Sequence, residues 1–235
     1  MKLITTVFLL AAILMAGALS IRAQTNSEPV VPMTAEEKQQ ASLNKHIKPI
    51  MDALNLNDAT KEAEVRGALS EFFIAHAAWH QTNDAALKSL WNDFNHARAK
   101  QDKAGADKAL AEIDGVYATF KPQHDKLVSS LATVLSPEQI ATVEDVLTVN
   151  KVKVTYNAYL EIFPALSTEQ KAVVLKDLQA AREQAIDAGS MTEKSAFFKK
   201  YKIEIEEDYL TSQGYDPKQA RKDFATKQKA TDAAK

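Results

Sequence analysis

Apolar side chains recur at helical spacing along most of the chain, and no long run alternates between polar and apolar positions. The clearest apolar arc falls between Asn57 and Lys100, and collects Val65, Leu69, Phe72, His76, Leu87, Leu90 and Phe94. The arc keeps its phase across residues 81–84, so the pattern predicts one long helix, with at most a mild kink. The fold class expected from this periodicity is all-α.

Capping residues, prolines and glycines divide the chain into helices. Helix starts are expected where a Ser or Thr cap precedes Glu or Gln by three residues, at Thr34, Ser136 and Ser167. Pro49 and Pro122 lie inside apolar stripes, where kinks are expected. Gly189 is expected to cap a helix C-terminus in the left-handed conformation, and the next helix is expected to end at Gly214. The result is a single irregular bundle of six or seven amphipathic helices over residues 34–215.

The two ends of the chain differ from this helical domain. Lys2, an apolar run and small residues up to Ala23 are typical of a secretory signal peptide over residues 1–23. A retained membrane anchor is the alternative, but the apolar run is short for a membrane span. Residues 24–33 are expected to form a flexible leader, and residues 216–235 a polar tail. The expected location is therefore the periplasm or the extracellular medium.

Charge and cysteine content exclude some classes of binding partner and of covalent chemistry. The formal net charge is -2, and loss of Lys2 and Arg22 with a signal peptide would take it to about -4. Without a basic face or tail, no nucleic-acid partner is expected. The sequence contains no cysteine, which excludes a lipid-modified cysteine, disulfides and thiol chemistry. Stability must then come from a packed core.

Polar residues within apolar arcs are the best candidates for a site, because buried polar groups must find partners. The ligand-binding residues proposed on this ground are His76, Trp79, His80, Asn83 and His124. Three interpretations remain open: hydrogen-bonded core histidines, a pocket for a small polar ligand, or a metal site. The spacing of His76 and His80 by four residues would let both imidazoles reach one ion, with His124 as a third ligand.

No motif in the chain assigns catalytic chemistry. A glycine-rich phosphate loop, a G-x-S-x-G nucleophile and an H-E-x-x-H metal motif are all missing from the sequence. No catalytic residue, metal ligand set or cofactor is therefore assigned, and an enzyme is less favoured than a binding protein.

Arg182 lies in the middle of the apolar stripe of residues 168–187, and a buried guanidinium needs a carboxylate. Glu204 and Asp208 share an arc with apolar residues of the next helix. A structural ion pair of Arg182 with Glu204 or Asp208 is therefore expected, with binding of an anionic ligand as the alternative.

Several segments resemble a secreted bacterial family, the "domain of unknown function 3826" family. They are LSPEQ at 135–139, VTYNAYLEIFPALSTEQKA at 154–172, AREQAIDAGS at 181–190 and QGYD at 213–216. The resemblance covers about residues 40–216. It implies a helical extracytoplasmic protein with a sugar-binding role linked to glycan use, and it supplies no catalytic residue.

LSPEQ and LSTEQ are also similar to the L-T-x-x-Q motif of small periplasmic helical chaperones, although that motif is largely a capping box. Three hypotheses follow. The first is a non-catalytic binding protein for an oligosaccharide or other small polar ligand. The second is a chaperone-like holdase. The third is a metal-binding protein or enzyme centred on His76 and His80. The sequence leaves the ligand and the oligomeric state open.

Overall fold

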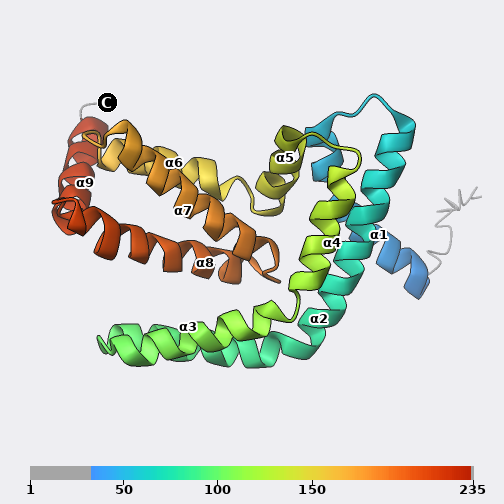
Figure 1. Cartoon of the computed structure of the whole chain (residues 1–235), viewed down its shortest axis with the longest axis horizontal. Helices are drawn as coiled ribbons and strands as arrows, with labels where there is room; N and C mark the ends of the chain where they lie inside the picture. Colours follow the sequence, from blue (N-terminus) through green and yellow to red (C-terminus); the bar gives the residue numbers. More distant parts are fainter. Residues whose placement is uncertain (1–32, 234–235) are drawn as a thin grey trace, which may run out of the picture.

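The computed structural model describes residues 33–233, and all the regular structure in that range is helical (Figure 1). The elements in chain order are α1 (Ala35–Leu54), α2 (Ala59–Ala99), α3 (Lys103–Ala118), α4 (Lys121–Ala132), α5 (Pro137–Leu147), α6 (Lys151–Ile162), α7 (Thr168–Ile186), α8 (Met191–Ile203), a π-helix η1 (Glu204–Leu210) and α9 (Pro217–Ala233). The all-α prediction is confirmed. The expected signal peptide and the leader, apart from Met33, lie outside the described residues.

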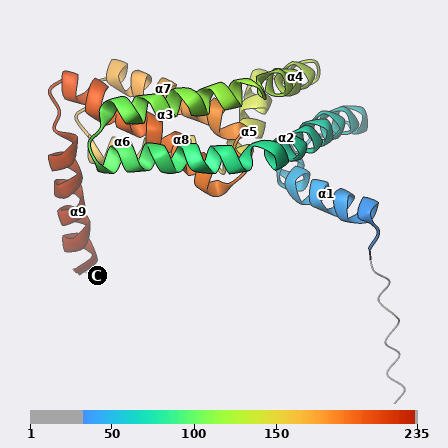
Figure 2. The ribbon, with the colours of Figure 1, turned by 90° about the horizontal axis from the view of Figure 1, so that it is seen from below.

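The long helix expected after Asn57 is present as α2, which begins at the cap Asp58. It is continuous, but it bends near its middle more than the apolar arc suggested (Figures 1 and 2). The side-chain amide of Asn83 donates to the backbone carbonyl of Trp79 at 2.8 Å. Side chains that compete for a helix's own carbonyls promote such bends. The first half of α2 thus packs against α1 and α4, and the second half runs beside α3.

Pro122 separates two helices, where the sequence predicted a kink within one. The α-helical hydrogen bonds stop at Thr119–Phe120, whose amides bond three residues back, and Pro122 lies in the first turn of α4. Proline suits that position because the first helical amides have no intrahelical acceptor. Pro49, by contrast, stays inside the continuous α1. The break between α3 and α4 lets this pair follow the bend of α2 (Figure 1).

The predicted helix starts are confirmed, since capping boxes form at Thr34, Ser136 and Ser167. A fourth box, from Ser190 to Glu193, begins α8. Gly214 has a left-handed conformation, with φ of +85°. Gly189 does not, because α7 ends at Ile186, and Gly214 is the only described glycine with positive φ. The prediction of a left-handed cap at Gly189 is wrong.

Two hydrophobic clusters make up the core of the described chain. One joins the second half of α2 to α3, α6, α7, α8 and η1, with Leu87, Phe94 and Phe197 among its buried residues. The other joins α1, the first half of α2, α4 and α5. Trp79 packs against both, and the end of α7 divides between them: Ile186, its last residue, belongs to one cluster and Ala188 to the other. The clusters therefore meet where α2 bends and α7 ends.

The predicted polar tail contains a helix, α9, which lies at the opposite end of the molecule from α1 (Figure 2). Its Arg221 makes an ion pair with Glu206 of η1. No helix within residues 33–233 combines the length and hydropathy needed to cross a membrane.

Candidate functional site

Three histidines from two helices converge on Asp187, the residue that follows α7. The Nε2 atoms of His76 and His80 lie 3.0 Å and 2.8 Å from its backbone carbonyl oxygen. The Nδ1 atom of His124, on α4, lies 2.8 Å from its carboxylate. Asp187 therefore connects α2, α4 and α7 at the junction of the two hydrophobic clusters.

The shared carbonyl fixes the protons of two of these rings. A carbonyl oxygen only accepts hydrogen bonds, so His76 and His80 both donate from Nε2. Burial lowers the pKa of His76 to about 3, with further lowering by His80 and Lys194. His76 is thus a neutral structural donor at ordinary pH.

His124, in contrast to the neutral His76, is positively charged. Burial lowers its pKa, but hydrogen bonds to Asp187 and Glu183 outweigh this effect and raise it to about 10. The side chains of His124 and Asp187 are each 11% exposed. The pair is therefore an almost buried imidazolium–carboxylate contact between α4 and the end of α7.

Gly189 owes its place to the close approach of His80. A β-carbon at this position would lie 2.6 Å from His80 Nδ1 and 2.7 Å from Cε1. The ring has little room to retreat, because His80 is buried and its Nε2 is bonded to Asp187. The glycine provides space, where the sequence had suggested conformational freedom.

The substitution Gly189→Ala is expected to destabilise the fold by about 1–3 kcal/mol, because the new methyl group overlaps the His80 ring. Urea unfolding followed by circular dichroism measures the change. Gly67→Ala is the matched control: a β-carbon there meets nothing within 4 Å, and alanine in a helix should stabilise by up to about 1 kcal/mol. Equal effects of the two substitutions would contradict the steric explanation.

A cleft of about 800 Å³ opens beside this cluster, between α1, α2 and the connections α5–α6 and α7–α8. His76 and His80 line it. The other three proposed ligand-binding residues do not. Trp79 donates to Thr119 at 2.9 Å, Asn83 bonds within α2, and His124 is buried behind Asp187.

Apolar and polar side chains both line the cleft. Ile74, Val149 and Met191 line it and are about half exposed, unlike most large apolar side chains of the described chain. Phe73 stacks on His46 with ring centroids 5.1 Å apart. The polar lining residues are Gln39, Ser42, Lys45, His46, His76, His80, Asp84, Asn150, Ser190 and Lys194. Such a surface suits a ligand with one apolar face and a polar edge.

Lys194 lies at the inner side of this cleft. Burial lowers its pKa to about 8, against the opposing effect of Asp187 and Glu193. Its ammonium donates to the carbonyl oxygen of Ala185 at 3.0 Å, which satisfies the C-terminal end of α7. Lys194 thus lines the cleft and also bonds to the last turn of α7.

Arg182 is buried as expected, but its predicted partners are wrong. It makes ion pairs with Glu144 and Asp145 of α5, and a longer contact of 3.6 Å with Glu183. It makes no ion pair with Glu204 or Asp208. Helix α7 packs against both α5 and α8, and the arginine lies on the side that faces α5.

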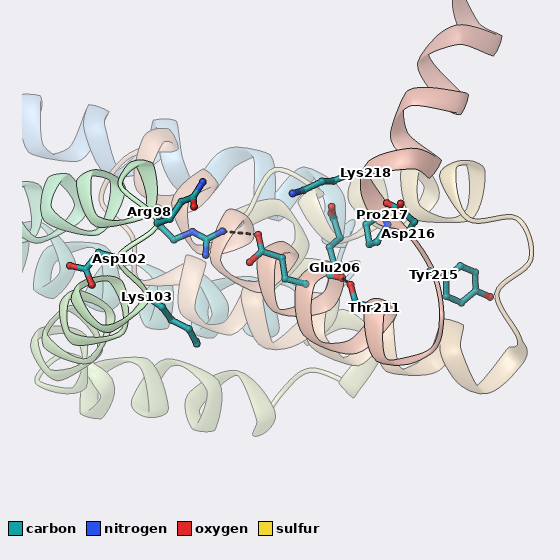
Figure 3. A pocket seen from close by; sticks show the side chains of 11 residues that line it. Arg98, Asp102, Lys103, Glu206, Thr211, Tyr215, Asp216, Pro217 and Lys218 are labelled. Carbon is teal, nitrogen blue, oxygen red and sulfur yellow. Dashed lines mark hydrogen bonds and ion pairs between the residues drawn. The ribbon is translucent and has the colours of Figure 1, made fainter.

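A second cleft of about 810 Å³ separates the α2–α3 turn from η1 and α9 (Figure 3). Several of its charged residues have partners inside or outside the cleft. Arg98 reaches from α2 to Glu207 at 2.7 Å. Glu206 accepts hydrogen bonds from Tyr159 and Arg221. None of its lining residues was proposed from the sequence, and the paired charges favour a structural role.

The three-histidine metal site considered from the sequence does not form. His76 and His80 direct Nε2 to one carbonyl oxygen, and His124 bonds to the opposite part of Asp187. Asp187 itself was missed, although it follows the helix that carries Arg182 and precedes Gly189. Its role depends on a backbone carbonyl, which no sequence pattern reveals.

Comparison with known sequences completes this description. No curated protein matches the chain. A family model described as "Protein of unknown function (DUF3826)" matches residues 40–230, which include every helix from α2 to α8 and most of α1 and α9. The chain belongs to the DUF3826 family.

Proposed function

We propose that the protein is a non-catalytic binding protein that acts in the periplasm or the extracellular medium, with a short oligosaccharide as its ligand. The observation that carries this proposal is the cleft between α1, α2 and the α7–α8 connection. Its volume of about 800 Å³ is in the range of small-molecule sites.

The mixed apolar and polar lining of the cleft supports a sugar as the ligand. A sugar ring has an apolar face of C–H groups and an edge of hydroxyls, and aromatic rings stack on the apolar face. Phe73 and His46 supply a stacked ring pair at the cleft, and Ile74 extends the apolar surface. Asp84 offers a carboxylate that is 63% exposed, and Asn150 an amide, for the hydroxyls.

The proposal predicts saturable binding of at least one member of a panel of neutral oligosaccharides, measured by isothermal titration calorimetry with EDTA present. His46→Ala should weaken that binding about 2- to 10-fold, because the stacked ring contributes about 0.5–1.5 kcal/mol. His46 is exposed, so its loss should leave the fold intact.

His96→Ala is the matched control, since His96 is an exposed histidine of α2 that lines neither cleft. It should bind like the unmodified protein. A panel without any saturable ligand would reject the sugar proposal. Equal weakening by the two variants would place the ligand elsewhere.

The exposed side chains Ile74, Val149 and Met191 favour a second candidate, a holdase that binds unfolded chains through the same cleft. A holdase should suppress aggregation of a reduced or heated client at near-stoichiometric ratios, and a sugar-binding protein should not. Suppression that is lost in a Met191→Ser variant, without binding in the sugar panel, would select this candidate.

A further inference from the structure

We infer that His80, Asp84 and Glu193 form a binding site for one divalent transition-metal ion, with Zn²⁺ as the expected occupant. The three side chains come from α2 and the first turn of α8. Each offers one ligand atom, and the three atoms lie within 4.8 Å of one another. This site is distinct from the three-histidine arrangement and does not depend on the sugar proposal.

His80 is oriented as metal-binding histidines usually are. Such a ring commonly donates one N–H to a backbone carbonyl and thereby directs its other nitrogen to the metal. His80 Nε2 donates to the carbonyl of Asp187 at 2.8 Å, and Nδ1 faces Asp84. Gly189 holds the ring in this orientation, because its missing side chain leaves the space that His80 fills.

The contact between His80 and Asp84 requires a positive charge. With the proton on Nε2, the lone pair of Nδ1 faces the Asp84 carboxylate oxygen at 2.6 Å. Two acceptors this close repel unless a proton or a metal ion lies between them. Tetrahedral zinc with bonds of about 2.0–2.2 Å holds its ligand atoms roughly 3.3–3.6 Å apart. The Asp84 side chain is 63% exposed, so it can move outward by the roughly 0.7–1 Å that this separation needs.

Glu193 can contribute without giving up its structural role. Its Oε2 atom accepts hydrogen bonds from the backbone amides of Gly189 and Ser190. Within residues 33–233, its Oε1 atom accepts none and is available to a metal. The capping bonds hold the Glu193 carboxylate in place, as hydrogen bonds to ligating carboxylates do at metal sites.

A buried tyrosine hydroxyl lies close to the site. Tyr117 is 8% exposed, and its hydroxyl makes no hydrogen bond within the described chain. Burial raises its pKa, and the nearby carboxylates of Glu193, Asp187 and Asp84 raise it further. Its hydroxyl therefore lies near these carboxylates. A metal-bound water between them would give it a partner.

One nitrogen and two carboxylate oxygens are a donor set that Zn²⁺ accepts, and three protein ligands leave a fourth position open. His80 and Asp84 line the cleft, so that position would face it. Lys194 follows Glu193 in sequence, but its ammonium is bonded at the end of α7. The open position could hold water or a hydroxyl group of a bound ligand.

The test is calorimetric titration of the EDTA-treated full chain, carrying no histidine tag, with ZnCl₂. One ion per chain should bind. Asp84→Asn and Glu193→Gln should each weaken binding at least about tenfold, the size of effect expected at a metal ligand. Glu193→Gln keeps an amide oxygen for the capping bonds, so folding should be retained.

Asp93→Asn is the control, because Asp93 is an exposed carboxylate on the second half of α2. It should bind Zn²⁺ as the unmodified protein does. Absence of saturable binding would overturn the inference, and so would equal affinity in Asp84→Asn, Glu193→Gln and Asp93→Asn. Circular dichroism of each variant identifies any loss that comes from misfolding, and a misfolded Glu193→Gln would leave Asp84→Asn to decide.

Discussion

Arg182→Met should reduce the free energy of unfolding by about 3–5 kcal/mol, measured by urea denaturation. Arg182 is 9% exposed, and the side chain of Glu144, its partner on α5, is 12% exposed. Burial and the nearby Glu183 raise the pKa of Glu144, and Arg182 opposes that rise, so the arginine favours the ionised carboxylate. Removal of one member of a buried pair leaves an uncompensated charge, which costs this much.

Two further variants test the explanation. Glu144→Gln in the Arg182→Met background should recover part of the loss, because the orphaned carboxylate is gone. Arg98→Met breaks a more exposed pair with Glu207, with side chains 33% and 54% exposed, and should cost about 1 kcal/mol or less. If Arg182→Met costs no more than Arg98→Met, Arg182 does not hold α7 to α5.

Helix positions could be predicted because their signals are local. The caps Thr34, Ser136 and Ser167 satisfy amides within three residues, and the arc of α2 depends only on helical spacing. The bend of α2 and the break at Pro122 were harder to predict from the sequence. Both depend on how α2 packs against two partners, and a preserved apolar phase does not report a change of partner.

The candidate site was predicted only in part. Burial of His124 and Arg182 followed from their apolar arcs and is confirmed. The order of the two α2 histidines was not predicted: His80, at the edge of the arc, is buried, and His76, at its centre, is partly buried. Their partners could not be predicted, because Asp187, Glu144 and Glu193 are brought near by contacts between helices far apart in sequence. Gly189 illustrates the same limit: its residue type was informative, but its neighbour, His80, comes from another helix.

The contact between His124 and Asp187 should make stability depend on pH. His124→Gln is expected to cost about 3 kcal/mol near pH 6, because it removes one member of an almost buried pair. Burial lowers the pKa of His124, but its hydrogen bonds to Asp187 and Glu183 raise the value in the folded protein to about 10, above the usual 6.5. The stabilisation is therefore complete below about pH 6.5, and declines as the pH rises towards 10.

Urea unfolding at several pH values between about 6 and 9 measures this decline. The difference between the unmodified protein and His124→Gln should shrink with rising pH by about 1.5–3 kcal/mol, the contribution of a hydrogen bond to a charged group. His76 titrates in another window, because its lowered pKa of about 3 affects stability only below about pH 6.5. His96→Gln, at an exposed position, should show no such trend. A constant or growing difference for His124→Gln would mean that the ring is neutral in the folded protein, and that Asp187 holds α4 through an uncharged hydrogen bond.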